Sequence, residues 1–143
     1  MCNLPPGSAL METGGYKGRS RRLPRHELHQ ILGERLGLPD DRIVCEYGMC
    51  ELSSQAYDRI AGSPNSARKL RFPPWARARI VSAENAVEVS AGRAGLIQVF
   101  DLANAFSAVA IQTEDLGIWD EDGFELIGRA TEAIPRGCSL MSV

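Results

Sequence analysis

The chain has 143 residues, which is enough for one domain with a substantial core. Its hydrophobic fraction of 44% and charged fraction of 24% are typical of a globular protein. The net charge of -2 argues against nucleic acid as the main partner, since proteins that bind nucleic acids usually carry a marked basic excess.

The cysteines and the apolar runs indicate where the protein works. Cys2, Cys45, Cys50 and Cys138 form no CxxC pair, and no histidine cluster accompanies them at zinc-ligand spacing. No secretory signal is recognisable, and no apolar run approaches the roughly 18 residues that span a bilayer. We therefore expect a cytoplasmic protein with reduced thiols and no transmembrane segment.

The first predicted elements are a strand, a loop and a helix. Residues 9–13 read as a short strand that ends at Gly14 and Gly15, a pair that allows close approach to the backbone. The basic loop "GGYKGRSRRLPR" follows, and Pro24 opens a helix whose apolar residues fit a period of 3.6. Gly37 suits the position just after the helix.

A second strand follows this helix, from Arg42 to Cys45. A strand, a helix and another strand in this order predict a parallel pair, with the ligand at the carboxyl ends of the strands. Gly14, Gly15 and Tyr47 all lie at that end. Residues 53–57 are a possible helix start.

The character of the sequence changes after "RFPPW". Short β-prone runs separated by turn signals predict a small antiparallel sheet or barrel, and these runs are residues 77–82, 87–89, 96–101, 107–113 and 124–127. We expect two parts, residues 1–71 and residues 72–143, with Trp75 packed in the core where they meet.

Two segments carry candidate chemistry. In "EYGMCE", an exposed Tyr47 could stack on a purine, Gly48 allows close approach, and Glu51 could bind a Mg²⁺ ion shared with phosphates. Alone, this segment is more typical of strand-end packing and a helix cap than of a ligand site. In "TEDLGIWDEDGFELIGR", Asp115 ends a predicted strand and could accept hydrogen bonds from both ribose hydroxyls, with Arg129 nearby.

Other features of the sequence have simpler explanations. The acidic "DEDG" is typical of a hairpin turn. "KGRSRR" fits a solvated loop or a loop over ATP phosphates better than an RNA contact, since no aromatic residues are interleaved. His26 and His29 do not match HExxH and are expected at the surface.

Together, the two segments resemble the YGxTE, TGDLG and GR motifs of the adenylate-forming ligases. The longer strings "METGGYKGR", "EYGMCELSSQAY", "VFDLANAFSAVAIQTEDLG" and "RGCSL" are similar to the acyl-protein synthetase branch of the LuxE type. The similarity extends over essentially the whole chain and corresponds to the C-terminal part of such an enzyme. It implies the parallel β-α-β portion of the ligase core followed by a small antiparallel β subdomain, an α/β fold.

The resemblance also implies roles for individual residues. Tyr47 would pack on adenine, and Gly14 and Gly15 would border the nucleotide and acyl pocket. Asp115 would hold the ribose hydroxyls with help from Arg129. Gly48, Met49 and Cys50 would belong to the nucleotide site, and Glu51 would bind Mg²⁺ as a catalytic residue.

The sequence departs from the family pattern at two places. Cys50 stands where the motif has a threonine that bonds a phosphate, and a thiol is a poor donor. The Ser/Thr/Gly-rich phosphate loop that precedes these motifs in the family is missing, and no Walker pattern replaces it. We expect the chain to begin inside the catalytic domain, and the 143-residue polypeptide to be inactive alone.

The implied activity is ATP-dependent activation of a carboxylic acid, such as a long-chain fatty acid, as an acyl-adenylate. Cys138, in "PRGCSLM", is the expected acyl acceptor, because Arg136 could favour the thiolate. An inert buried thiol is the competing interpretation. Partners would be the acid and an acyl-acceptor or reductase protein. Two rival hypotheses are a phenylacetate-type CoA ligase and a non-catalytic remnant that binds a nucleotide or a protein.

Overall fold

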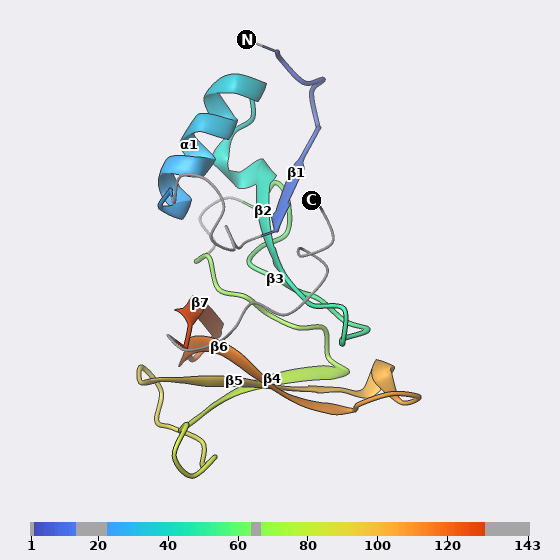
Figure 1. Ribbon diagram of the computed structural model, residues 1–143. Helices are drawn as coiled ribbons and strands as arrows, with labels where there is room; N and C mark the ends of the chain where they lie inside the picture. Colours follow the sequence, from blue (N-terminus) through green and yellow to red (C-terminus); the bar gives the residue numbers. More distant parts are fainter. Residues whose placement is uncertain (1, 14–22, 64–66, 131–143) are drawn as a thin grey trace, which may run out of the picture.

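The computed structural model describes residues 2–13, 23–63 and 67–130 (Figure 1). Within these ranges the elements are β1 Leu10–Thr13, α1 Arg25–Leu36, η1 Asp40–Arg42, β2 Ile43–Tyr47, β3 Ala56–Tyr57, β4 Ala76–Val81, β5 Ala94–Asp101, η2 Leu102–Asn104, β6 Ala110–Asp120 and β7 Gly123–Arg129, where η marks a 3-10 helix. The predicted α/β fold class is confirmed. None of the helices in the described ranges has the length and apolar character that a membrane crossing demands.

The first half of the chain forms a three-stranded sheet in the order β1-β2-β3. β1 pairs with β2 in parallel, with Thr13 opposite Glu46, so the carboxyl ends of both strands lie at one edge. β3 pairs with β2 in the antiparallel direction. The parallel pair and its shared carboxyl edge were both predicted from the β-α-β pattern.

The helix begins and ends where its residues predict. The Leu28 amide donates to the carbonyl of Pro24 at 3.0 Å, and Gly37 adopts the left-handed conformation with φ of 66°. His26 is exposed as expected, but the expectation of a surface His29 is wrong. His29 is buried, and its Nε2 lies 3.1 Å from Glu12 Oε1 on β1, so a carboxylate partner accounts for a histidine on the packed face.

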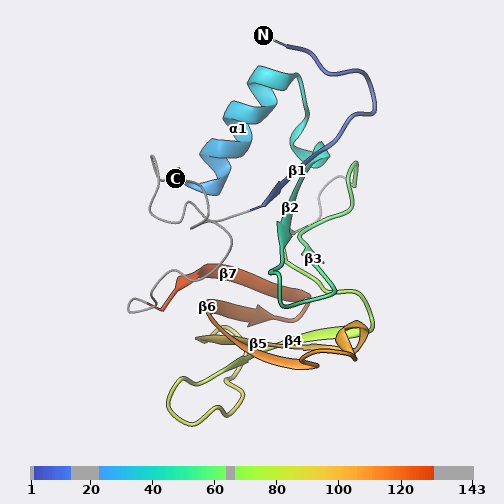
Figure 2. The same cartoon turned by 45° about the vertical axis from the view of Figure 1, so that its right-hand side comes forward.

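The second half forms an antiparallel sheet, which is one of the two predicted forms, and the sheet has four strands in the order β4-β5-β6-β7. Figures 1 and 2 show the three-stranded sheet and α1 on one side of it. β6 does not end at Asp115, as the sequence suggested, but continues to Asp120. Between the pairs Leu96–Leu116 and Gln98–Gln112, β6 has more residues than β5, so the register shifts there. The segment of β6 that contains Asp115 is therefore a β-bulge.

Aromatic rings join the two sheets. Tyr47 from β2 packs edge-on against Phe72 and Phe124, with ring centroids 6.4 Å and 5.6 Å away, and Phe72 stacks on Phe124. The backbone of Leu70 also exchanges two hydrogen bonds with Phe124 on β7. The hydrophobic core is therefore centred at the junction between the sheets.

Three further expectations are wrong. Residues 53–57 start no helix; residues 53–55 are a loop, and residues 56 and 57 form the short strand β3. Residues 87–89 form no strand in the sheet, and only the isolated bridge Val81–Glu88 occurs there. Trp75 is 53% exposed and is not a core residue, although its indole N–H donates to the Ser54 hydroxyl at 3.0 Å.

Candidate functional site

Three residues from separate motifs meet where the two sheets join. The Tyr47 hydroxyl at the end of β2 donates to Asp115 Oδ2 at 3.0 Å, and Arg129 Nε at the end of β7 donates to Asp115 Oδ1 at 3.0 Å. Asp115 and Arg129 are directly opposite each other in the β6–β7 ladder. The sequence named all three as candidates, and the structure brings them together around one carboxylate.

Tyr47 is 6% exposed, so the expectation of an exposed ring is wrong. Its edge-on neighbours Phe72 and Phe124 cover the ring. Burial, followed by the charge of Asp115 and the hydrogen bond to it, raises the pKa of Tyr47 well above its ordinary value. The phenol therefore stays protonated and remains a hydrogen-bond donor to Asp115.

Asp115 owes its direction to the bulge in β6. The Thr113 hydroxyl donates to the carbonyl of Ile97 at 2.9 Å and accepts from the Asp115 amide at 3.1 Å. Thr113 is buried, and it closes the gap that the bulge leaves in the ladder. The side chain of Asp115 is thereby aimed at Tyr47 and Arg129, while 17% of it remains exposed.

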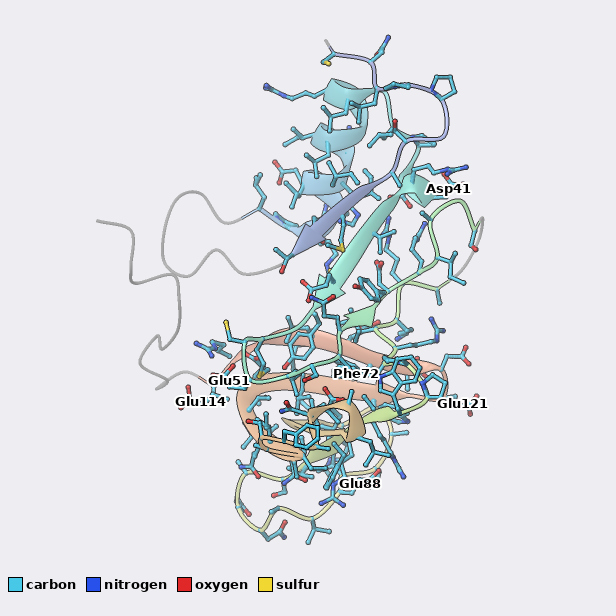
Figure 3. The ribbon with its side chains drawn as sticks, turned by 90° about the vertical axis from the view of Figure 1, so that its right-hand side faces the viewer. Asp41, Glu51, Phe72, Glu88, Glu114 and Glu121 are labelled. Carbon is cyan, nitrogen blue, oxygen red and sulfur yellow. The ribbon has the colours of Figure 1, made fainter. Side chains whose placement is uncertain are left out.

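The loop after Tyr47 carries the other candidates. Met49 is partly buried against the core, whereas Cys50 and Glu51 are exposed. At Gly48 an added Cβ would contact the Glu46 carboxylate and lie 3.1 Å from Gln55 Cγ, so a larger residue would require these side chains to move. Figure 3 shows Glu51 in this loop at the level of the junction between the sheets.

No group of three metal-ligating side chains occurs among the residues that the structure describes. The described residues therefore give Glu51 no ready-made cation site, and a cation there would need ligands from elsewhere, such as a substrate. Mg²⁺ is usually bound in this way, by one or two carboxylates plus substrate phosphates. The exposed carboxylate of Glu51 fits that requirement.

Sequence reasoning missed Asp101 and Asn104, which fix the loop. The amides of Ser53 and Ser54 donate to Asp101 Oδ2 at 2.9 Å and 2.8 Å, and Asn104 Nδ2 donates to the carbonyl of Glu51 at 2.7 Å. Burial opposes ionisation of Asp101, but the hydrogen bonds from Ser54, Ala103 and Ser53 hold its pKa below the ordinary value. The only signal was that both residues belong to the string "VFDLAN", which carried part of the family resemblance.

Gly14, Gly15 and Cys138 lie outside the described residues. Their predicted places beside the nucleotide and at the acyl-transfer step stay predictions.

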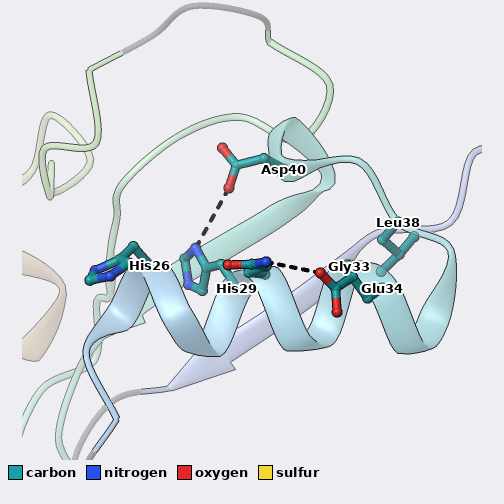
Figure 4. Close-up of a pocket in the computed structure, with 7 residues that line it drawn as sticks. His26, His29, Gly33, Glu34, Leu38 and Asp40 are labelled. Carbon is teal, nitrogen blue, oxygen red and sulfur yellow. Dashed lines mark hydrogen bonds and ion pairs between the residues drawn. The ribbon is translucent and has the colours of Figure 1, made fainter.

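A separate open pocket of about 470 Å³ lies against α1 (Figure 4), and its lining residues include none of Tyr47, Asp115 and Arg129. His29 Nδ1 lies 3.9 Å from Asp40 Oδ1 at this pocket, and His29 also bonds Glu12. Burial opposes the charge of Asp40, but the hydrogen bond and charge of Arg68 hold the pKa of that carboxyl below its ordinary value. We interpret this group as a structural link between α1, β1 and η1.

Comparison with known families decides the identity of the chain. A family model described as acyl-protein synthetase, LuxE, matches residues 2–142. The chain belongs to the LuxE acyl-protein synthetase family. This membership accounts for the motifs that first suggested it, and no curated protein shows significant similarity.

Solved structures show which fold this LuxE-family chain adopts. Apo MatB from Rhodopseudomonas palustris is 19% identical with a TM-score of 0.59, over 88% of this chain and 26% of that one. The luciferase-like enzyme of the nonluminescent mealworm Zophobas morio is 21% identical with a TM-score of 0.56, over 89% and 32%. McyG A-PCP complexed with phenylalanyl-adenylate is 20% identical with a TM-score of 0.59, over 90% and 26%. The chain thus spans about a quarter to a third of these relatives.

Tyr47→Phe is expected to lower the free energy of unfolding by about 1–2 kcal/mol, because Asp115 then loses a buried donor while the ring packing is kept. Urea unfolding of the 143-residue chain measures this loss. Tyr57→Phe is the control, since Tyr57 is 37% exposed and its hydroxyl donates to the exposed Gln55 side chain. Equal losses in the two variants would contradict the assignment.

Proposed function

We propose that this chain forms the ribose-binding and metal-binding side of an ATP-dependent acyl-adenylate site. The whole protein would activate a long-chain fatty acid as acyl-AMP, release pyrophosphate and pass the acyl group to a cysteine thiol. Membership of the LuxE acyl-protein synthetase family supports the proposal. Two structural relatives add to it, since MatB was solved with ATP bound and McyG with phenylalanyl-adenylate.

The observation that carries the proposal is the placement of Asp115 between Tyr47 and Arg129. Each carboxylate oxygen of Asp115 accepts one of these two hydrogen bonds and keeps a second lone pair, so Asp115 can also accept from a ribose diol. The side chain of Arg129 is 44% exposed and can reach the ribose or a phosphate. Because the Tyr47 ring is covered, we propose that Tyr47 serves the nucleotide mainly by orienting Asp115.

Glu51 is the proposed Mg²⁺ ligand, with the remaining ligands coming from the phosphates of ATP. When bound, the cation would neutralise negative charge on the phosphates. Gly48, Met49 and Cys50 would line the nucleotide beside Glu51, and Gly14 and Gly15 would border it from the other strand end. The backbone there would supply the donor that the Cys50 thiol supplies poorly.

Cys138 is the proposed acyl acceptor. Its thiolate would attack the carbonyl carbon of the acyl-adenylate, the bond from that carbon to the phosphate oxygen would break, and AMP would leave with the electron pair. Cys45 is unsuited to this step, because burial, followed by the nearby Glu12, raises the pKa of its thiol to about 12. The acceptor must be reduced, which fits the cytoplasmic location expected from the sequence. A reductase would be a suitable partner to consume the thioester.

The experiment that tests this function supplies the chain with radiolabelled long-chain acyl-AMP. We expect label on Cys138 that hydroxylamine removes and that Cys138→Ser abolishes. Cys2→Ser is the control, because Cys2 is exposed and reports unselective acylation. Label spread equally over the exposed cysteines would refute the acceptor role. In a second reaction that also contains CoA, acyl-CoA formation that is unaffected by Cys138→Ser would establish the CoA-ligase alternative.

The 143-residue polypeptide alone is expected not to catalyse fatty-acid-dependent exchange of pyrophosphate into ATP. Its sequence contains no Ser/Thr/Gly-rich phosphate loop, so the triphosphate would lack much of its binding site. Exchange measured with labelled pyrophosphate above the enzyme-free rate would overturn this expectation.

A further inference from the structure

The loop that carries Glu51 is fixed to the four-stranded sheet by a buried carboxylate. Asp101 is fully buried, and its Oδ2 accepts from the amides of Ser53 and Ser54. Its Oδ1 accepts from the Ser54 hydroxyl at 2.8 Å and from the Ala103 amide at 3.0 Å. These four donors compensate for burying the charge, which would otherwise be costly.

Asn104 completes the attachment with every polar atom of its side chain. Its Nδ2 donates to the carbonyls of Glu51 and Ala108, at 2.7 Å and 2.9 Å, and its Oδ1 lies 3.0 Å from the Ser53 hydroxyl. Two carbonyls can only accept, so the nitrogen of the amide must face them. An aspartate has no N–H group to donate to these carbonyls.

The bonds act on the backbone at and beside Glu51, while its side chain stays exposed. The carbonyl of residue 51 and the amides of residues 53 and 54 are all held, and the Leu52 amide donates to the carbonyl of Met49 at 3.1 Å. Each of these four consecutive residues, 51–54, therefore has a fixed backbone group. The result is an exposed carboxylate on a rigid support, which is the arrangement that a metal ligand requires.

We propose that Asp101 and Asn104 are positioning residues, which hold Glu51 where its carboxylate reaches the cation on the phosphates of ATP. The inference rests on the proposed function. The proposed site then has two halves. Asp115, Tyr47 and Arg129 would bind the ribose, whereas η2 would position Glu51 to bind the metal and, through it, the phosphates.

The test compares the affinities of the 143-residue chain for AMP and for ATP, each with and without Mg²⁺, by calorimetry. We define the Mg²⁺ gain as the ratio of the ATP affinity with Mg²⁺ to the ATP affinity without it. In Asn104→Asp we expect an unchanged affinity for AMP and a Mg²⁺ gain that is about tenfold smaller. Ser53→Ala removes one bond of the network and no core side chain. It should lower the same gain by a smaller factor, and it serves as the test if Asn104→Asp does not fold.

Gln98→Glu is the matched control, because it makes the same amide-to-carboxylate change in a partly exposed ladder with Arg79 and Gln112. We expect it to leave the Mg²⁺ gain unchanged, which distinguishes positioning from general destabilisation. If Asn104→Asp folds and keeps the full Mg²⁺ gain, the inference is wrong while the proposed function stands. If Asn104→Asp does not fold, the same outcome in Ser53→Ala decides. A parent chain that binds neither AMP nor ATP overturns the proposed nucleotide site and this inference with it.

Discussion

Asp115→Asn is expected to weaken AMP binding by about 1.5–3 kcal/mol, which is roughly a ten- to hundredfold increase in Kd. The substitution keeps the shape of the side chain and removes the charge that would strengthen hydrogen bonds from the ribose hydroxyls. It also replaces one of the two carboxylate oxygens that accept from Tyr47 and Arg129 by an NH2 group, so it weakens the support of the side chain. Calorimetric titration of the 143-residue chain with AMP measures the effect.

Asp122→Asn is the control for this prediction. This variant makes the same chemical change on the same hairpin, but the Asp122 side chain is 78% exposed and lies 4.0 Å from Arg71. AMP affinity should stay within error of the parent in this variant. If Asp115→Asn bound AMP as tightly as the parent while its urea unfolding remained cooperative, Asp115 would not be the ribose ligand.

The elements that the sequence predicts well are those whose signals are local. Pro24 marks the start of α1, because a helix start does not need the amide that proline lacks. Gly37 marks its end, because glycine adopts the left-handed conformation at little cost. The turn at Asp122 and Gly123 likewise predicts the β6–β7 hairpin, and the β-α-β order predicts the parallel pair. Each of these features depends on residues within a few positions of one another.

The features that the sequence does not predict depend on distant partners. Residues 53–55 form a loop rather than a helix because Asp101, far along the chain, accepts hydrogen bonds from the amides of Ser53 and Ser54. His29 is buried because Glu12 on β1 accepts it. Neither partner can be identified from a local pattern, since side-chain hydrogen bonds across the fold compete with helix propensity and with surface exposure.

The candidate site shows the same division. Family resemblance named Tyr47, Asp115 and Arg129, and the structure brings them together. It did not indicate that Tyr47 is covered, because the covering rings of Phe72 and Phe124 come from beyond the first sheet. Nor did it indicate that Thr113 and a bulge orient Asp115. Motifs identify the reacting groups, whereas their packing and support come from the rest of the fold.

Phe124→Ala is expected to lower the free energy of unfolding by about 3–5 kcal/mol, a large part of the total for a domain of this size. Phe124 is 1% exposed, and its ring contacts both Tyr47 and Phe72 at the junction of the sheets. Truncation removes buried apolar area and leaves a cavity that two other rings cannot fill without moving. Urea unfolding followed by tryptophan fluorescence measures the loss.

Phe106→Ala is the control for Phe124→Ala, because Phe106 is fully exposed and the same truncation there creates no cavity. Its unfolding free energy should stay within about 0.5 kcal/mol of the parent. Phe124→Leu keeps most of the volume and should cost less than the alanine variant. Because Phe124 supports the ring whose hydroxyl orients Asp115, Phe124→Ala should also weaken AMP binding under conditions where it is still folded. A loss below about 1 kcal/mol, with AMP affinity unchanged, would show that the two sheets are joined by contacts other than this aromatic cluster.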